Sequence, residues 1–312
     1  MNKQNWVKIF NSKQTTADDW QTITLKSYAH RTLVAFATDW NAFNEYCLSI
    51  NTTALPASVD TVVRFLDEKA KTRKLASLKR YVITIRLAHR SLTMTDPCSH
   101  TQVRVLMQQF HDQKKDDNKQ AAPLHAFHID QLYSRFQTAT SPKDVRDLAI
   151  WCLAFDALLK RGELSAITLE NIIIESNGLI TLTLESKSIR LSPATSAAIN
   201  RWLTLSMIDE GYLFRRIDRH GNIGDNPLDH SSIYRVFRRA SDELGVPANK
   251  IFSGQSPRVG AAQDLAFEGA SLNEIQAQGR WKSPAMPAQY IGQKTKRDEE
   301  MDKFKTETPW DQ

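Results

Sequence analysis

The sequence predicts a mainly α protein, in which an N-terminal helical bundle precedes a C-terminal α+β domain with a small antiparallel sheet. Apolar residues recur at helical spacing through most of the 312 residues, and the period changes to strand alternation near residue 180. A charged stretch without apolar periodicity separates the two parts. A chain of this length is typical of two domains.

Residues 21–112 are predicted to form the helical bundle, behind a mobile arm at residues 1–20. Its clearest helix has apolar residues at steps of three and four, namely Leu33, Phe36, Trp40, Phe43 and Cys47. Ser58 is placed to cap the following helix. Three apolar faces define the remaining helices: Val62 to Leu66, Leu78 to Ile85 and Val103 to Phe110.

The polar stretch His111–Ala122, with the sequence HDQKKDDNKQAA, is the best candidate for a linker. We set the linker at residues 113–123, and a solvated helix end is the alternative interpretation. Residues 124–295 then form the second domain, and residues 296–312 form a C-terminal tail.

A short sheet is predicted inside the second domain, which is otherwise helical. Ile180, Leu182 and Leu184 alternate with threonines, as in a half-buried strand. Asn177-Gly178 is a hairpin turn signal that pairs this strand with residues 172–175. A third strand is expected over residues 188–191, and helices dominate from there to the C-terminus.

Composition excludes several classes of protein. Lys and Arg number 41 against 35 Asp and Glu, a net charge of +6 that permits a polyanionic partner without demanding one. Cys47, Cys98 and Cys152 are too few and too scattered for a disulfide framework or a zinc site. No apolar run approaches a membrane span, and the first residues lack the core of a signal peptide. We therefore expect a soluble cytoplasmic protein.

Two segments place charged residues where they need partners. Arg161 and Glu163 follow a strongly apolar helix, where charges are costly unless they are satisfied; a surface ion pair is the alternative. Lys187 lies in a tight turn between two strands, where it is either solvated or held rigidly in a ligand groove.

Two further segments lie nearer the C-terminus. In SGQSPRVGAA, residues 253–262, Pro257 fits the first helical position and Arg258 the first turn, where helix N–H groups favour an anion. Trp281 follows in the sequence GRWKS, and Tyr290 comes nine residues later. Taken singly, Arg258 is also explained as a surface arginine, Trp281 as a core aromatic and Tyr290 as a core or surface tyrosine.

The order of these residues resembles the tyrosine recombinase (phage integrase) family, and within it the Cre-type members. In that family the segment reads SGHS-x-RVGAA, followed by an apolar helix, a G-x-W motif and a nucleophilic tyrosine nine residues after the tryptophan. Residues 253–291 follow this pattern closely. Residues 27–47 also look like the first helices of the family's core-binding domain.

The resemblance implies a role for each matching residue. Tyr290 is the nucleophile, Lys187 the general acid, and Arg161 and Arg258 the two arginines that bind the phosphate. Trp281 is a donor to the phosphate or a buttress for the tyrosine, and Glu163 orients a neighbouring group. Gln255 departs from the pattern because it occupies the position of the family's histidine.

The implied activity is site-specific DNA recombination or integration through a 3′-phosphotyrosine intermediate, without metal or ATP as cofactor. The absence of a Walker motif from the sequence agrees with this. Because a glutamine donates a hydrogen bond but does not titrate, Gln255 predicts a slowed or context-dependent recombinase. A non-catalytic DNA-binding accessory protein and a topoisomerase-like relaxase of supercoils are the alternatives.

The resemblance also implies the partners. These are double-stranded DNA with specific recombination sites, bound by the bundle and the catalytic domain together, and copies of the same chain. We expect a homotetramer on DNA, with the tail docked onto a neighbouring protomer, a monomer or weak oligomer when free, and association with the nucleoid.

Two basic clusters are the expected DNA contacts, with solvated helix faces as the alternative. The first comprises Lys71, Arg73, Lys74, Lys79, Arg80, Arg86 and Arg90, and the second comprises Arg215, Arg216, Arg235, Arg238 and Arg239.

Overall fold

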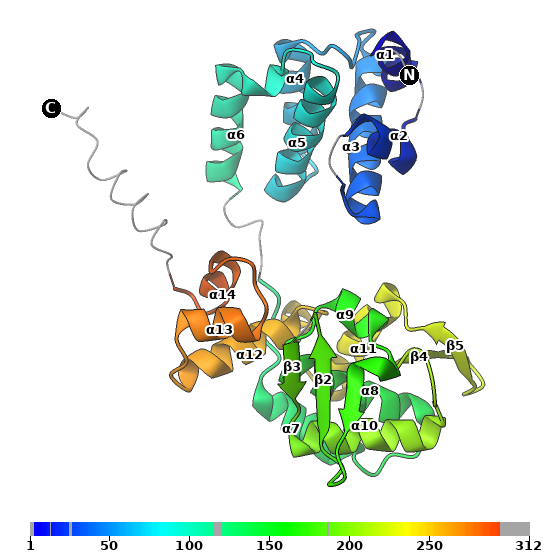
Figure 1. Ribbon diagram of the computed structural model, residues 1–312. Helices are drawn as coiled ribbons and strands as arrows, with labels where there is room; N and C mark the ends of the chain where they lie inside the picture. Colours follow the sequence, from blue (N-terminus) through cyan, green and yellow to red (C-terminus); the bar gives the residue numbers. More distant parts are fainter. Residues whose placement is uncertain (1–2, 13, 25–26, 115–119, 186, 294–312) are drawn as a thin grey trace, which may run out of the picture. The chain divides into compact units, whose positions relative to one another are not determined.

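The computed structural model describes residues 3–12, 14–24, 27–114, 120–185 and 187–293. The chain divides into two compact units between residues 119 and 120, a point inside the stretch that the sequence marks as a linker, and each unit is described by itself. Both units are mainly helical, and the second contains small antiparallel sheets (Figure 1). The predicted fold class is thus confirmed. Within the described ranges, no helix is both long and apolar enough to cross a membrane.

The first unit is a bundle whose core is rich in aromatic rings. All five residues that predicted its longest helix, including Phe36 and Trp40, are buried. Ser58 caps the following helix as predicted, since its hydroxyl accepts a hydrogen bond from the Thr61 amide at 3.0 Å. The elements are α1 (Lys3–Ser12), α2 (Ala17–Ile23), α3 (His30–Ser49), α4 (Val59–Ala70), α5 (Leu75–Ser91), η1 (Pro97–Ser99) and α6 (Thr101–Gln113).

The expectation of a mobile arm is wrong for the described residues before position 21. Helix α1 buries Trp6 and Phe10, and α2 buries Trp20. The indole of Trp40 donates to the carbonyl of Phe10 at 3.0 Å, which ties α1 to α3. Large aromatic side chains bury enough area to hold short polar helices onto a core. The polar composition of residues 1–20 gave no indication of this burial.

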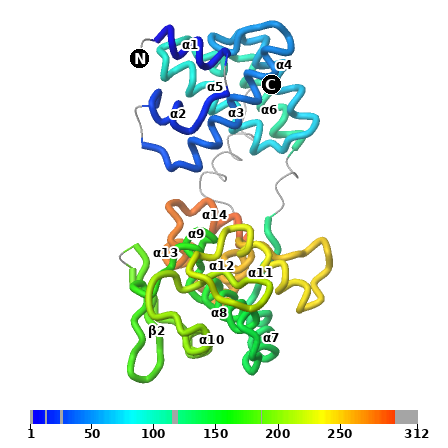
Figure 2. The backbone as a smooth tube through the Cα atoms, turned by 90° about the vertical axis from the view of Figure 1, so that its right-hand side faces the viewer, coloured from blue at the N-terminus to red at the C-terminus, as the bar shows by residue number. Residues whose placement is uncertain are grey.

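The second unit is built around α8, in which ten consecutive residues from Val145 to Ala154 are buried. Helices α12, α13 and α14 lie together at one end of the unit (Figure 2). The elements are α7 (Ala126–Phe136), α8 (Pro142–Asp156), α9 (Arg161–Ala166), η3 (Leu169–Asn171), β1 (Ile172–Ile174), β2 (Ile180–Leu184), β3 (Lys187–Arg190), α10 (Pro193–Ser206), β4 (Arg215–Ile217), β5 (Ile223–Pro227), α11 (His230–Glu243), η4 (Ala248–Lys250), α12 (Ser256–Phe267), α13 (Leu272–Gln278) and α14 (Ala285–Tyr290).

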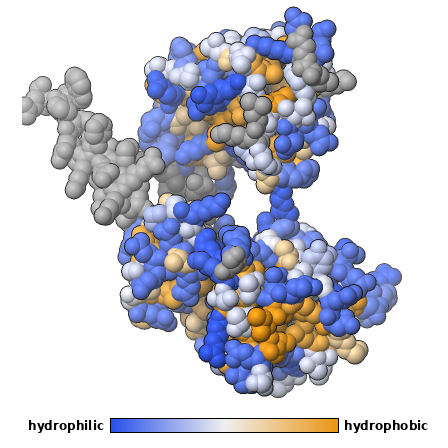
Figure 3. All heavy atoms as spheres, viewed as in Figure 1, coloured by the Kyte–Doolittle hydropathy of each residue, from blue (hydrophilic) through white to orange (hydrophobic). Residues whose placement is uncertain are grey.

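The predicted three-stranded sheet is present, in the order β1-β2-β3 and antiparallel throughout. Gly178 takes a φ of +80° in the turn between β1 and β2, as the Asn-Gly signal predicts. Lys187 opens β3 and pairs with Leu184. Ile173 and Ile174 of β1 are 60% and 51% exposed, and Figure 3 shows an apolar patch on the surface of the second unit.

A second sheet, β4-β5, replaces the helices expected after residue 191 in this stretch. Its turn is fixed by Asp218, whose carboxylate accepts hydrogen bonds from the amides of His220 and Asn222 at 2.7 and 2.9 Å. Gly221 completes the turn at a φ of +89°. The strands are too short to show alternation in the sequence, so the turn residues were the only available signal.

The expected linker does not behave as one uniform segment. Helix α6 continues to Gln113, and residues 120–125 are packed against the second unit, with Leu124 fully buried. Positions 115–119, and the tail at 296–312, lie outside the described residues.

Candidate active site

Arg258 occupies the first turn of α12, directly after Pro257, and is buried. Its Nη2 donates to the carbonyl of Gly279 at 2.8 Å, and its Nη1 donates to the carbonyl of Leu158. The guanidinium carbon lies 4.2 Å from the centroid of the Trp281 ring. Burial lowers the pKa of Arg258 to about 10, so this side chain is a fixed cation at neutral pH.

Tyr290 ends α14 and is also buried, with 6% of its surface exposed. Its ring meets that of Trp281 edge to face, at a centroid separation of 5.8 Å and an interplanar angle of 77°. Burial raises the pKa of the Tyr290 phenol above its ordinary value, while the charge of Arg258 acts in the opposite direction. The phenol is therefore protonated at neutral pH and has a cation nearby.

Glu163 links the other end of the site to this cluster. Its carboxylate accepts from the backbone amide of Lys160 at 2.7 Å, from Lys160 Nζ at 3.0 Å and from Arg280 Nη2 at 2.9 Å. Burial acts to raise the pKa of Glu163, but these hydrogen bonds and the Arg280 charge outweigh it and lower the pKa. Glu163 is therefore ionised and holds two cations.

Arg280 was missed by the sequence reasoning, although it lies inside the GRW motif. It donates to the carbonyls of Ala157 and Leu158 at 3.0 and 3.4 Å, as well as to Glu163. It therefore joins the segment before Trp281 to the end of α8. The backbone φ of Arg280, +54°, cannot be recognised in the sequence. Lys160 is the second cation that was missed, and its spacing of three residues from Glu163 at the start of a helix would have indicated their ion pair.

Arg161 and Gln255 are both exposed, and Arg161 lies against Gly254, the residue before Gln255. A methyl group on Gly254 would lie 3.4 Å from Cβ and from Cδ of Arg161. The aliphatic part of Arg161 thus runs along the loop that precedes α12.

Lys187 reaches the site from the sheet. Its Nζ donates to the carbonyl of Ala277 at 3.2 Å, near the end of α13. Lys187 and Arg280 both line a cavity of about 230 Å³. The structure therefore brings Arg258, Trp281, Tyr290 and Glu163 into one connected cluster, with Lys187, Arg161 and Gln255 at its edges.

The basic residues of the first unit divide into two groups. Arg80 binds the buried carboxylate of Asp39 through two hydrogen bonds of 2.6 and 2.7 Å, and Arg86 binds Asp96 at 2.9 Å. These two arginines hold the bundle together. Arg80 is nevertheless exposed, as are the members of the set for which no ion pair is described: Lys71, Arg73, Lys74, Lys79 and Arg90.

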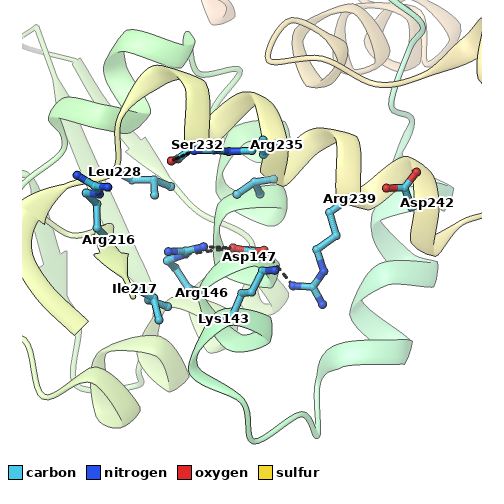
Figure 4. Close-up of a pocket in the computed structure, with 11 residues that line it drawn as sticks. Lys143, Arg146, Asp147, Arg216, Ile217, Leu228, Ser232, Arg235, Arg239 and Asp242 are labelled. Carbon is cyan, nitrogen blue, oxygen red and sulfur yellow. Dashed lines mark hydrogen bonds and ion pairs between the residues drawn. The ribbon is translucent and has the colours of Figure 1, made fainter. Parts of the chain in front are cut away.

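Three residues of the second basic set, Arg216, Arg235 and Arg239, line a pocket of about 460 Å³ between α8, β4 and α11 (Figure 4). Asp147 at its base accepts from Arg146 Nη2 at 2.8 Å and from Arg239 Nη1 at 3.0 Å. Arg216 and Arg235 line the pocket without contacting Asp147 in the figure. Arg215 and Arg216 lie on a strand, so the helix expected around them is wrong. Arg215 binds Asp225 at 2.9 Å, and Arg238 is exposed.

Fold and site together define a tyrosine recombinase, an enzyme that transfers DNA strands. The model of the phage integrase family matches residues 123–297, which is more than half of the chain, and the chain belongs to this family. The resemblance drawn from the sequence is confirmed, and so is the expectation of an enzyme.

Two curated relatives match nearly the whole chain. An integrase/recombinase xerD homolog from Selenomonas ruminantium is 27% identical over 287 residues, covering 86% of this chain and 83% of the relative. The recombinase Cre of Escherichia phage P1 is 23% identical over 315 residues, covering 93% of this chain and 88% of the relative.

Solved structures share the fold at low identity. The Tn1549 transposon integrase in complex with transposon right end DNA has a TM-score of 0.65 at 12% identity, covering 94% of this chain and 98% of that chain. A lambda integrase dimer bound to a core site has a TM-score of 0.61 at 13% identity, with 92% and 94% covered.

Proposed function

We propose that this protein is a site-specific DNA recombinase or integrase that cuts and rejoins DNA through a phosphotyrosine at Tyr290. The observation that carries the proposal is the packing of Tyr290 on Trp281 and of Trp281 on Arg258. It puts a phenol beside a buried cation at the end of the segment that follows the family pattern.

The chemistry is a pair of phosphoryl transfers. The Tyr290 oxygen attacks a DNA phosphorus and gives its proton to solvent water, the bond from phosphorus to the 5′ oxygen breaks, and that oxygen takes a proton from Lys187. Arg258 and Arg161 donate to the non-bridging oxygens as charge develops there. The reverse reaction, with a new 5′ hydroxyl, reseals the strand. The ester energy is retained in the phosphotyrosine, so resealing needs no ATP, and the two arginines supply the positive charge that a metal ion would otherwise provide.

DNA approaches the second unit on the side where Arg161 and Gln255 are exposed. Cationic side chains beside the site favour a polyanion, and the pocket lined by Arg216 and Arg235 suits a backbone phosphate. In the first unit the exposed basic residues around α5, such as Lys79, have the same role. Binding is expected to weaken steeply with salt.

The assembly follows from the same function. The first unit is the core-binding domain and the second the catalytic domain, and four chains act on two DNA sites in the cytoplasm, at the nucleoid. The relatives named Cre and xerD homolog are recombinases by name, which supports recombination as the outcome.

A nicked suicide duplex tests the proposal. Covalent adducts would be mapped on a library of genomic duplexes, and the recovered site would be built as a nicked substrate. We expect an SDS-stable adduct between protein and DNA that is lost in Tyr290→Phe. An adduct that persists in Tyr290→Phe would show that another residue is the nucleophile.

A second candidate is a DNA-binding accessory protein of the same fold without cleavage activity. Gln255 favours it, because this exposed side chain replaces a histidine and has no titrating group. Site-selective DNA binding without any adduct on the mapped duplexes would establish this candidate. A monomer that relaxes supercoils without site preference would indicate the topoisomerase-like alternative.

A further inference from the structure

Residues 120–126 run along α12 and are named here the strap. They are the first described residues after the division between the two units. The amide of Leu124 donates to the carbonyl of Ser256 at 3.0 Å. Further along α12, the carboxylate of Asp264 accepts hydrogen bonds from His125 Nδ1 at 2.6 Å and from the amide of Ala126 at 2.8 Å. The C-terminal part of the strap, residues 124–126, is thus tied to α12 at Ser256 and at Asp264.

At Leu124 the strap also touches α12 backbone to backbone. A methyl group built on Gly260 would lie 1.9 Å from the carbonyl oxygen of Leu124. Only glycine allows this approach, and the Leu124 side chain is fully buried. The strap is therefore part of the packed unit, and its position is fixed relative to Arg258 on the same helix.

The start of the strap reaches the backbone of Tyr290. The Tyr290 carbonyl is at the end of α14, where helix carbonyls lack a partner within the helix. Two side-chain amides satisfy it: Gln263 of α12 donates at 2.8 Å, and Gln120 of the strap donates at 3.3 Å.

We propose that Gln120 and Gln263 are positioning residues that hold Tyr290 in place through its backbone carbonyl. Gln263 fixes the tyrosine to the helix that carries Arg258, and Gln120 fixes it to the chain that leads to the first unit. This inference rests on the proposed role of Tyr290.

The geometry separates this role from general packing. Gln120 is exposed, so truncating it removes little buried surface and leaves Leu124 and the Asp264 contacts in place. The hydroxyl that reacts and the carbonyl that is held belong to the same residue. A change in the carbonyl contact therefore changes the population of the attacking geometry before it changes DNA affinity.

Single-turnover cleavage of the mapped nicked duplex at saturating DNA is the main test. We expect Gln120→Ala and Gln263→Ala each to slow adduct formation by about three- to tenfold, the effect of one neutral hydrogen bond, with an unchanged Kd for DNA. Because both amides share one acceptor, their effects should be coupled. The factor by which the double variant slows adduct formation should therefore differ from the product of the two single factors. Gln137→Ala is the matched control, since Gln137 makes only a local contact to Ser134.

Amide hydrogen exchange provides a readout that needs no cleavage. In Gln120→Ala and Gln263→Ala, exchange should accelerate in the last turn of α14 and up to Gln293, and should stay at the parent rate in α8. Cleavage and exchange at parent rates in both variants would overturn the inference while leaving the proposed function intact. If the parent protein forms no adduct, the proposed function is overturned. Hydrogen exchange then still tests whether Gln120 and Gln263 hold the backbone of Tyr290.

Discussion

The guanidinium of Arg258 lies 4.2 Å from the centre of the Trp281 ring, and Tyr290 meets the same ring edge to face. One indole therefore separates the two groups that are proposed to bind the phosphate and to attack it. The ring face attracts the cation, and the ring edge fixes the plane of the phenol. This relationship leads to the first prediction.

Trp281→Ala should impair both stability and cleavage. Removing the ring leaves Arg258 and Tyr290 without their shared contact, so we expect a loss of about 2–4 kcal/mol in unfolding free energy and at least about tenfold slower adduct formation. Trp281→Phe retains a ring and should lose about 1 kcal/mol or less. Urea unfolding and single-turnover cleavage would measure both. Equal effects of the two variants would contradict a role for the ring.

Gln255→His should accelerate cleavage. Gln255 is exposed at the start of α12, where an imidazole could exchange protons with the reacting oxygens. A general base contributes up to about 10²-fold, so the gain should fall within that range, with little change in stability. The measurement is the rate of adduct formation by parent and variant on the same nicked duplex. A variant no faster than the parent would show that Gln255 does not limit the reaction.

Arg161→Ala should separate binding of the phosphate from folding. Arg161 is exposed, so its loss should change the unfolding free energy by about 0.5 kcal/mol or less while slowing cleavage about 10²- to 10³-fold.

Lys160→Ala is the matched control for Arg161. It removes the contact with Glu163 Oε1 and should cost about 0.5–1 kcal/mol of stability, with a small effect on rate. If cleavage is lost in Lys160→Ala and kept in Arg161→Ala, the role of the first arginine belongs to Lys160.

The parts of the fold that repeat a period were predictable from the sequence. Leu33 to Cys47 and Ile180 to Leu184 show clear helix and strand spacing, and the structure agrees. The N-terminal helices were missed because Trp6, Phe10 and Trp20 are too sparse to show a period. Their burial depends on a surface supplied by α3, which is distant in sequence.

For the candidate site, the sequence identified the residues of the motif but not the contacts that connect them. Trp281 and Tyr290 were found from their spacing, and the structure places them in contact. Arg280 was missed because its role depends on a left-handed backbone and on carbonyls at the end of α8. Gln120 was hidden because a linker composition gives no indication of a contact 170 residues away.

Gly260→Ala should destabilise the second unit. A Cβ at this position would overlap the Leu124 carbonyl at 1.9 Å, and both groups are backbone, so neither moves easily. We expect a loss of about 1–3 kcal/mol or more, seen as a lower Tm. Gly224→Ala is the control, because its Cβ would have an ordinary contact of 3.8 Å. Equal Tm values for the two variants would exclude the close approach of the strap.

The buried phenol of Tyr290 should make stability depend on alkaline pH. Its pKa is raised by burial, opposed in part by Arg258. The folded state therefore holds the proton more tightly than the unfolded chain, whose tyrosines ionise near about 10. The contribution of Tyr290 to the unfolding free energy is fully present below the ordinary tyrosine pKa. It is lost as the pH rises through the raised pKa of the folded state, because over this range ionisation stabilises only the unfolded chain.

Tyr290→Phe isolates this effect, since phenylalanine keeps the ring and removes the ionisation. The parent should lose unfolding free energy relative to Tyr290→Phe as the pH rises above about 10, at a slope of up to about 1.4 kcal/mol per pH unit. Chemical unfolding of both proteins across that range is the measurement. The other tyrosines are common to both proteins and cancel in the difference. A flat difference would mean that the phenol ionises as readily in the folded protein as in the unfolded chain, and hence that solvent reaches it.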